Sequence, residues 1–245
     1  MKLRIDLNCD MGEGMPNDAL IMPFITSANI ACGFHVGSGA IIRHTMALAK
    51  QHGVLVGAHP SFHDRENFGR KEKQLPPDKL YAIVLEQIIK VDLVAKELGV
   101  PLHHVKPHGA LYNMAAKDKA MAATIAQSIK DYNEALVLYG LSGSYLISEA
   151  KAIGLKTMSE VFADRTYQDD GSLTPRSQPN ALIEDEDKAI AQAMQMMAGT
   201  VTSVNGTTIP ITAQTICLHG DGKHAVAFVQ RIHTALQQKN SAQTI

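Results

Sequence analysis

Short apolar runs alternate along the chain with longer segments of helical periodicity. The runs are rich in β-branched side chains and end at Gly, Pro, His or charged residues, as buried parallel strands usually do. They predict seven strands, at Leu3–Leu7, Ala28–Cys32, Val54–Ala58, Leu102–Val105, Ala135–Tyr139, Leu155–Val161 and Thr215–Leu218. The segments between them predict six helices, at Gly39–Gln51, Asp78–Leu98, Lys117–Tyr132, Gly143–Ile153, Asp185–Ala198 and Lys223–Gln238.

The segment Asp78–Leu98 is the clearest of these helices. Its apolar residues recur at spacings of three and four, which places one apolar stripe on the side that faces a sheet. Gly99 then ends the helix, and Pro101 prevents it from resuming. Repeated strand–helix alternation with right-handed crossovers indicates a parallel sheet, either open and doubly wound or closed into a barrel.

One segment breaks the alternation. Val201–Val204 and Thr207–Ile211 flank Asn205-Gly206, the pattern of a two-stranded hairpin with a tight turn. We therefore predict a small antiparallel insert near residues 201–212, before the last strand. The chain shows neither an internal repeat nor a linker, so residues 1–245 are predicted to form one domain.

Polar and titratable side chains follow the predicted strands. In a parallel α/β structure the carboxyl ends of all strands lie on one face, and active sites are built there from the loops of several strands. These residues predict an enzyme site at that face: Asn8, Asp10, Glu13, His35, His59, Lys106, His108, Asp164, Arg165, His219 and Asp221.

Histidine is the unusual residue type, with eleven copies and no tryptophan in the chain. A single histidine after a strand is more often a structural residue than a catalyst. Four of them, however, follow strands in small-residue loops: His35, His59, His108 and His219. This repetition favours a functional site, whereas Asp6, inside the first predicted strand, is open to interpretation as a buried structural carboxylate.

Composition narrows the class of protein. Hydrophobic residues make up 45% and charged residues 19%, enough for a sizeable core. The formal net charge of -1 gives no sign of nucleic acid or an anionic membrane as partner, and no apolar run approaches the roughly 18 residues that span a bilayer. The three cysteines are far apart and odd in number, which argues against a disulfide framework and favours the cytoplasm.

Familiar site signatures are absent. The chain has no G-x-x-x-x-G-K-[ST], no G-x-G-x-x-G after its first strand, no H-E-x-x-H and no G-x-S-x-G. Two chemistries stay open. Asp and His side chains could hold a divalent metal that activates water, or His, Asp and Lys could work as acids, bases and charge stabilisers without a metal.

Long motifs, in order along nearly the whole chain, resemble the LamB/YcsF family. They are Asp6–Gly14, Ser27–Gly37, Val56–Ser61 with Phe68–Arg70, Val105–Asn113, Glu160–Tyr167, Leu173–Arg176 and Ile216–Asp221. The resemblance implies a seven-stranded β/α barrel of the glycoside hydrolase/deacetylase type. Two departures are small: Asn180 stands where family members more often have glycine, and His63–Asn67 is slightly atypical.

The resemblance also implies an activity. It is the cleavage of the lactam 5-oxo-L-proline to L-glutamate, coupled to conversion of ATP to ADP and phosphate, in a complex with 5-oxoprolinase subunits B and C. ATP would be a co-substrate, with Mg²⁺ possible beside it. Because the chain shows no phosphate cradle, we expect a nucleotide site shared with the partner subunits.

For that reaction, cations must surround the phosphate and the developing oxyanion. Lys106, Arg165 and Arg176 are the candidates. The residues Asn8, Glu13, His35 and Asp164 complete the predicted substrate-binding set.

Proton transfer needs a base for water and a donor to the leaving nitrogen. We expect His108 or His59 as the base, and Asp10 or Asp221 as the carboxylate that orients it. His219 is the candidate donor. Together with Lys106 these form the predicted catalytic set.

Two other functions are kept open. One is a metal-dependent deacetylase of an N-acetylated carbohydrate, in which Asp10, His59 and His108 are the metal ligands. The other is a non-catalytic regulatory partner protein, which the crowd of titratable residues after the strands disfavours.

Overall fold

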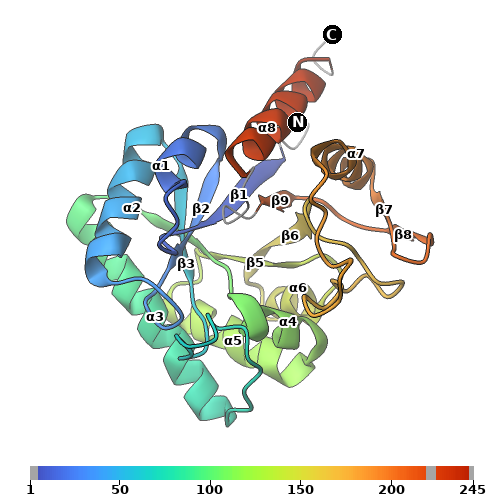
Figure 1. Ribbon diagram of the computed structural model, residues 1–245. Coiled ribbons are helices and arrows are strands. Elements are labelled where there is room, and N and C mark those ends of the chain that lie inside the picture. Colours follow the sequence, from blue (N-terminus) through green and yellow to red (C-terminus); the bar gives the residue numbers. More distant parts are fainter. Residues whose placement is uncertain (1–4, 219–224, 243–245) are drawn as a thin grey trace.

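The computed structural model describes residues 5–218 and 225–242. Within these residues, seven parallel strands close a barrel in the order β1-β2-β3-β4-β5-β6-β9 (Figure 1). The strands are β1 (Asp6–Met11), β2 (Ser27–Ala31), β3 (Leu55–His59), β4 (Leu102–Val105), β5 (Val137–Leu141), β6 (Lys156–Phe162) and β9 (Thr215–Leu218). Of the two arrangements that the sequence left open, the closed barrel is confirmed.

Helices surround the strands and cover the outside of the barrel (Figure 1). They are α2 (Gly39–His52), α3 (Pro77–Leu98), α4 (Gly109–Lys117), α5 (Lys119–Tyr132), α6 (Tyr145–Ala152), α7 (Glu186–Met197) and α8 (Ala225–Ala242). A short helix, α1 (Asp18–Ile21), and a 3₁₀ turn, η1 (Met22–Phe24), connect β1 to β2. None of the helices in the described part of the chain is both long and apolar enough to cross a lipid bilayer.

Local sequence explains where the long helices begin and end. Ser38 caps α2 by accepting a hydrogen bond from the backbone N–H of Ile41, and Pro77 occupies the first position of α3, where no N–H is needed. Gly99 ends α3 in the left-handed conformation, at φ 62°. The sequence pattern therefore located α3 to within one residue at its start and correctly at its end.

The predicted hairpin is confirmed as a separate antiparallel pair, β7 (Thr200–Thr202) and β8 (Thr208–Pro210). The predicted helix Lys117–Tyr132 is shorter, because Asp118 interrupts it and caps α5 with its side chain. The preceding helix α4 was not predicted, since its sequence follows directly on the Lys-Pro-His-Gly loop.

The first strand lies later than predicted. The apolar pattern points to Leu3–Leu7, but β1 runs over Asp6–Met11. Leu7, Cys9 and Met11 pack in the apolar core, while the residues between them form the polar barrel interior. Asn8 and Asp10 are therefore strand residues and do not belong to a loop that follows the strand.

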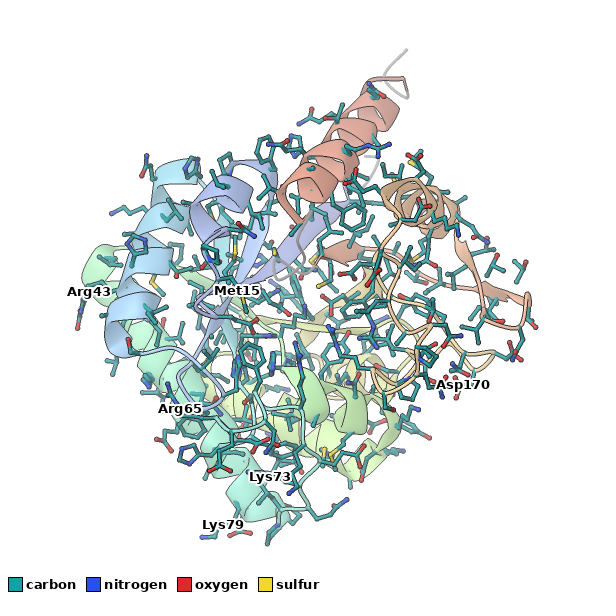
Figure 2. The ribbon with its side chains drawn as sticks, in the orientation of Figure 1. Met15, Arg43, Arg65, Lys73, Lys79 and Asp170 are labelled. Atoms are coloured by element: carbon teal, nitrogen blue, oxygen red, sulfur yellow. The ribbon has the colours of Figure 1, made fainter. Side chains whose placement is uncertain are left out.

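The barrel interior is built from polar layers. At the amino-terminal end, Asp6 accepts hydrogen bonds from the hydroxyls of Thr26, Ser27 and Thr215, so it is a structural carboxylate. In the middle, the ring of His104 contacts the side-chain oxygen of Asn29 through Nε2 at 2.8 Å. Asn29 in turn donates to Asn8. The charged side chains of Arg43 and Lys79, by contrast, lie on the outer surface (Figure 2).

Candidate active site

A cavity of about 620 Å³ opens at the carboxyl-terminal face of the barrel. Its floor includes Asp10 from β1, His59 from β3, and Lys106 and His108 from the segment after β4. Arg165, from the loop after β6, and Arg176 line it as well. The topology has thus brought together residues that are up to 166 positions apart in the chain, from Asp10 to Arg176.

Backbone carbonyls orient the two imidazoles at the floor. Nδ1 of His59 lies 2.7 Å from the carbonyl oxygen of Lys106, and Nε2 of His108 lies 2.9 Å from the carbonyl oxygen of Phe68. A carbonyl only accepts hydrogen bonds, so each of these nitrogens carries the ring proton. In the neutral rings, Nε2 of His59 and Nδ1 of His108 are therefore unprotonated, and they face each other at 2.9 Å.

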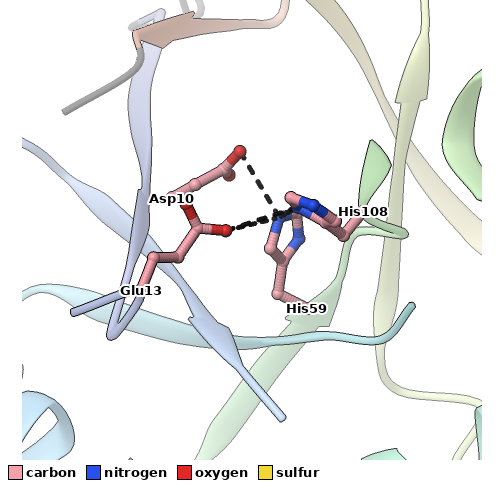
Figure 3. Close-up of side chains that lie close together, drawn as sticks. All are labelled: Asp10, Glu13, His59 and His108. Atoms are coloured by element: carbon pink, nitrogen blue, oxygen red, sulfur yellow. Dashed lines mark hydrogen bonds and ion pairs between the residues drawn. The ribbon is translucent and has the colours of Figure 1, made fainter. Parts of the chain in front are cut away.

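Two carboxylates point at the same place (Figure 3). Oδ2 of Asp10 lies 3.3 Å from Nε2 of His59. Oε1 of Glu13 lies 3.3 Å from Nδ1 of His108 and 3.9 Å from Nε2 of His59. One ligand atom from each of the four residues falls within 4.8 Å of the other three. We call Asp10, Glu13, His59 and His108 the floor cluster.

Further polar residues hold the floor cluster in place. Asn29 and Lys106 both donate to Oδ1 of Asp10, at 2.8 and 2.9 Å. His35 is buried behind the cluster, where its Nε2 lies 3.1 Å from Oε1 of Glu13 and its ring stacks on His108 at 3.8 Å between centroids. Gly69 makes this packing possible, because a Cβ there would come within 2.9 Å of both His35 and His108.

Electrostatic neighbours set the protonation of the rings and of the lysine. Burial, reinforced by His59 and His35, lowers the pKa of His108 well below its ordinary value, and burial also lowers the pKa of His35 despite Glu13 beside it. Burial alone would lower the pKa of Lys106, but Asp10, Cys217 and Glu160 outweigh it and raise that pKa well above the ordinary value. Lys106 is thus a buried ammonium.

Glu160 is a buried carboxylate beside the candidate site that the sequence pattern does not single out. It lies in β6, is fully buried, and places Oε1 2.9 Å from Nζ of Lys106. It opens the motif Glu160–Tyr167, but the motif alone gives it no role. The available signal was a carboxylate next to the apolar end of a predicted strand, because a buried glutamate is rare unless its charge is paired.

The arginine side of the cavity carries concentrated positive charge. Arg165 is 4% exposed and donates hydrogen bonds to the carbonyl oxygens of Ala181 and Thr174. Among the described residues it forms no ion pair within 4 Å, and burial together with nearby Arg176 lowers its pKa to about 10. Two neighbouring guanidiniums in one cavity form a site suited to an anion.

The remaining predicted site residues lie elsewhere. Among the described residues, Asn8 and His35 do not line the cavity; Asn8 contacts Asn29 and Lys106, and His35 contacts Glu13. Asp164 is half-buried in the loop after β6 and does not line the cavity either. His219 and Asp221 lie outside the described residues.

Residues 5–244 match the model of the LamB/YcsF family. The chain is 52% identical over 248 residues to the 5-oxoprolinase A subunit of Bordetella parapertussis, covering 99% of this chain and 98% of the relative. It is 53% identical over 243 residues to the protein of the same name from Geobacillus kaustophilus, covering 97% of this chain and 95% of the relative.

Solved structures share the fold of this chain. The lactam utilization protein from Thermus thermophilus superposes with a TM-score of 0.90 at 41% identity, over 97% of each chain. A family 4 carbohydrate esterase from Streptomyces lividans superposes with a TM-score of 0.52 at 12% identity, over 97% of this chain and 90% of the esterase. The second likeness is one of fold alone.

Proposed function

The chain belongs to the LamB/YcsF family, and from that premise we propose that it is the A subunit of an ATP-dependent 5-oxoprolinase. The reaction opens the lactam of 5-oxo-L-proline to L-glutamate and converts ATP to ADP and phosphate. The names of the relatives support the lactam as substrate. The structural observation that carries the proposal is one cavity that joins the floor cluster to the cations Lys106, Arg165 and Arg176.

The first task of such an enzyme is to activate a resonance-stabilised amide. In the proposed reaction the lactam oxygen attacks the γ-phosphorus of ATP, and ADP leaves. Arg165 and Arg176 hold the transferred phosphoryl group, because guanidiniums bind phosphate oxygens in pairs. Lys106 carries the positive charge nearest the floor cluster and stabilises negative charge that develops beside it.

The second task is to deliver water. A water molecule attacks the activated carbonyl carbon and loses a proton to the floor cluster, which combines two unprotonated ring nitrogens with two carboxylates. The C–N bond then breaks, the nitrogen takes the proton that the floor cluster received from water, and γ-glutamyl phosphate is left. A second water releases phosphate from it and gives L-glutamate.

The partners and the compartment belong to the same proposal. Subunits B and C supply the rest of a nucleotide site, since the described residues contain no phosphate-binding loop of the usual kind. We place the complex in the cytoplasm, which accords with three buried cysteines that form no disulfide.

The test is release of ADP and L-glutamate from 5-oxoproline and ATP, using this chain with subunits B and C and each mixture that lacks one of them. We expect coupled release only from the complete mixture. Arg165→Gln should lower kcat/KM by about 10²–10³-fold, the usual cost of one well-placed charge donor. Arg231→Gln is the matched control, because Arg231 pairs on the surface with Glu186 and Asp187.

Two results would contradict the proposal. If subunits B and C by themselves give full turnover, the chain is a non-catalytic partner. If the complete and folded mixture gives none, while the chain releases acetate from an N-acetylated carbohydrate, the deacetylase function replaces it.

A further inference from the structure

The contact between the two floor imidazoles is unusual. Backbone carbonyls take the ring protons of both His59 and His108, so two filled lone pairs face each other at 2.9 Å. Two such lone pairs repel each other unless a positive charge lies between them. Either an extra proton or a metal ion can supply that charge.

The carboxylates distinguish these two possibilities. A shared proton satisfies only the pair of nitrogens, but Oδ2 of Asp10 and Oε1 of Glu13 converge on the same point. Buried carboxylates gather in this way around cations. Among the described residues, Asp10 and Glu160 contact the ammonium of Lys106, whereas Glu13 contacts the imidazoles of His59 and His108, so a divalent cation would add positive charge where carboxylates outnumber the ammonium.

The second ring nitrogens of His59 and His108 have the hydrogen-bond partners that are usual for metal-binding histidines. Each metal-binding imidazole usually donates its second N–H to a carbonyl or carboxylate, which fixes the ring and the tautomer. Both His59 and His108 do so to backbone carbonyls. His35 and Asn29 add polar contacts to Glu13 and Asp10, respectively, so both carboxylates have a second layer of support.

The spacing of the ligand atoms fits one ion. Two ligands at right angles around an ion with bonds of about 2.1 Å lie about 3.0 Å apart, and tetrahedral ligands lie about 3.4 Å apart. Four of the six spacings here are 2.9, 3.3, 3.3 and 3.9 Å, and all six are within 4.8 Å. Two nitrogens and two carboxylate oxygens are ligands typical of a divalent first-row metal such as Zn²⁺ or Mn²⁺.

From this arrangement we infer that Asp10, Glu13, His59 and His108 bind one divalent first-row metal ion at the floor of the cavity. The inference adds Glu13 to the candidate ligands that the sequence suggested. Its catalytic meaning rests on the proposed function: a metal there would activate the attacking water, and because the two ring lone pairs would then be coordinated, the proton of that water would pass to a carboxylate oxygen of the floor cluster. The binding itself does not depend on that function.

The test measures binding on the full chain. The protein is treated with chelator, dialysed and titrated with Zn²⁺ or Mn²⁺ in a calorimeter, and bound metal is counted by elemental analysis. We expect one ion per chain. His59→Ala and His108→Ala should each weaken binding by at least about 100-fold, since even supporting residues cost 10–100-fold. His63→Ala is the matched control, because His63 is an exposed histidine of the neighbouring loop.

Two outcomes would overturn the inference: a folded apoprotein that binds less than about a tenth of an equivalent of either metal, or binding that survives both alanine substitutions unchanged. Circular dichroism establishes that each variant is folded, and Glu13→Gln serves as a variant that keeps the volume of the side chain. Metal that binds without any 5-oxoproline turnover would leave this inference standing and remove the proposed function. Turnover of 5-oxoproline without metal binding would overturn this inference and support the proposed function.

Discussion

Lys106 is the residue on which the charge balance of the barrel interior depends. Its ammonium lies 2.9 Å from both Asp10 and Glu160 and is almost fully buried. Desolvating three charges is costly, and only their close contacts offset that cost. These ion pairs therefore stabilise the fold only while the ammonium and its carboxylate partners are all present.

Removing the ammonium of Lys106 alone should strongly destabilise the folded protein. We expect Lys106→Met to lower the free energy of unfolding by about 3–5 kcal/mol, because it leaves Glu160 charged and unpaired in the interior. The double variant Lys106→Met/Glu160→Gln should recover a large part of that loss. Urea unfolding of the wild type, both single variants and the double variant measures the coupling energy. If the two single effects simply add, Lys106 and Glu160 are not coupled.

Cys32 permits a prediction about pH. Burial raises its pKa to about 12, so at pH 8 about one molecule in 10⁴ carries the reactive thiolate. We expect iodoacetamide to leave Cys32 unmodified in the folded protein and to modify it fully in guanidinium chloride. Mass spectrometry of the peptide that contains Cys32 distinguishes these states.

The raised pKa of Cys32 also affects the free energy of unfolding. The unfolded thiol has a pKa of about 8.5, whereas the pKa of the folded one is about 12. Cys32 therefore contributes stability that is fully present below about pH 8.5 and is lost as the pH rises toward 12. Rapid alkylation of Cys32 at pH 8 in the folded protein would contradict both the predicted protection from iodoacetamide and the predicted loss of stability at high pH.

At the scale of single elements, the close pairing of β3 with β4 depends on Gly57. A Cβ at this position would lie 2.2 Å from the ring of His104, which is buried in the neighbouring strand. His104 also stacks on Tyr139 at 4.1 Å between centroids and contacts Asn29. The ring therefore has little room to move away from a larger residue at position 57.

Gly57→Ala should lower the free energy of unfolding by about 1–3 kcal/mol or more, the usual cost of overpacking a core. Gly39→Ala is the matched control, because its Cβ would meet no atom within 4 Å and alanine favours the helix by about 0.5–1 kcal/mol. Thermal unfolding of the two variants should shift the midpoint in opposite directions. A Gly57→Ala variant as stable as the wild type would show that the strand pair can separate.

Periodicity predicted the elements well where one pattern governs a segment. It located α3 and β4 closely, because an apolar stripe or a short apolar run ends there at glycine, proline or charge. It failed for β1, since the side chains that face the barrel interior are polar and resemble those of a loop. It also missed α4, which begins immediately after the Lys-Pro-His-Gly loop with no polar N-cap bond to announce it.

At the scale of the molecule, parallel topology made the site partly predictable. Side chains that follow parallel strands converge whatever their distance in sequence, which correctly grouped Asp10, His59, Lys106 and His108. Depth within the barrel was not predictable, because it depends on strand tilt and register. For that reason the sequence does not show that Asn8 is buried away from the cavity lining, or that the buried carboxylate of Glu160 contacts Lys106.

That same convergence links the inferred metal to global stability. The four ligands come from β1 with its following turn, the end of β3 and the start of α4, so the unfolded chain cannot present them together. A metal that binds only the folded chain should raise the free energy of unfolding by about 2.7 kcal/mol at 100 times its dissociation constant. Urea unfolding with and without metal measures this, and His59→Ala should abolish the increase while His63→Ala keeps it. An increase that persists in His59→Ala would place the stabilising ion somewhere other than the floor cluster.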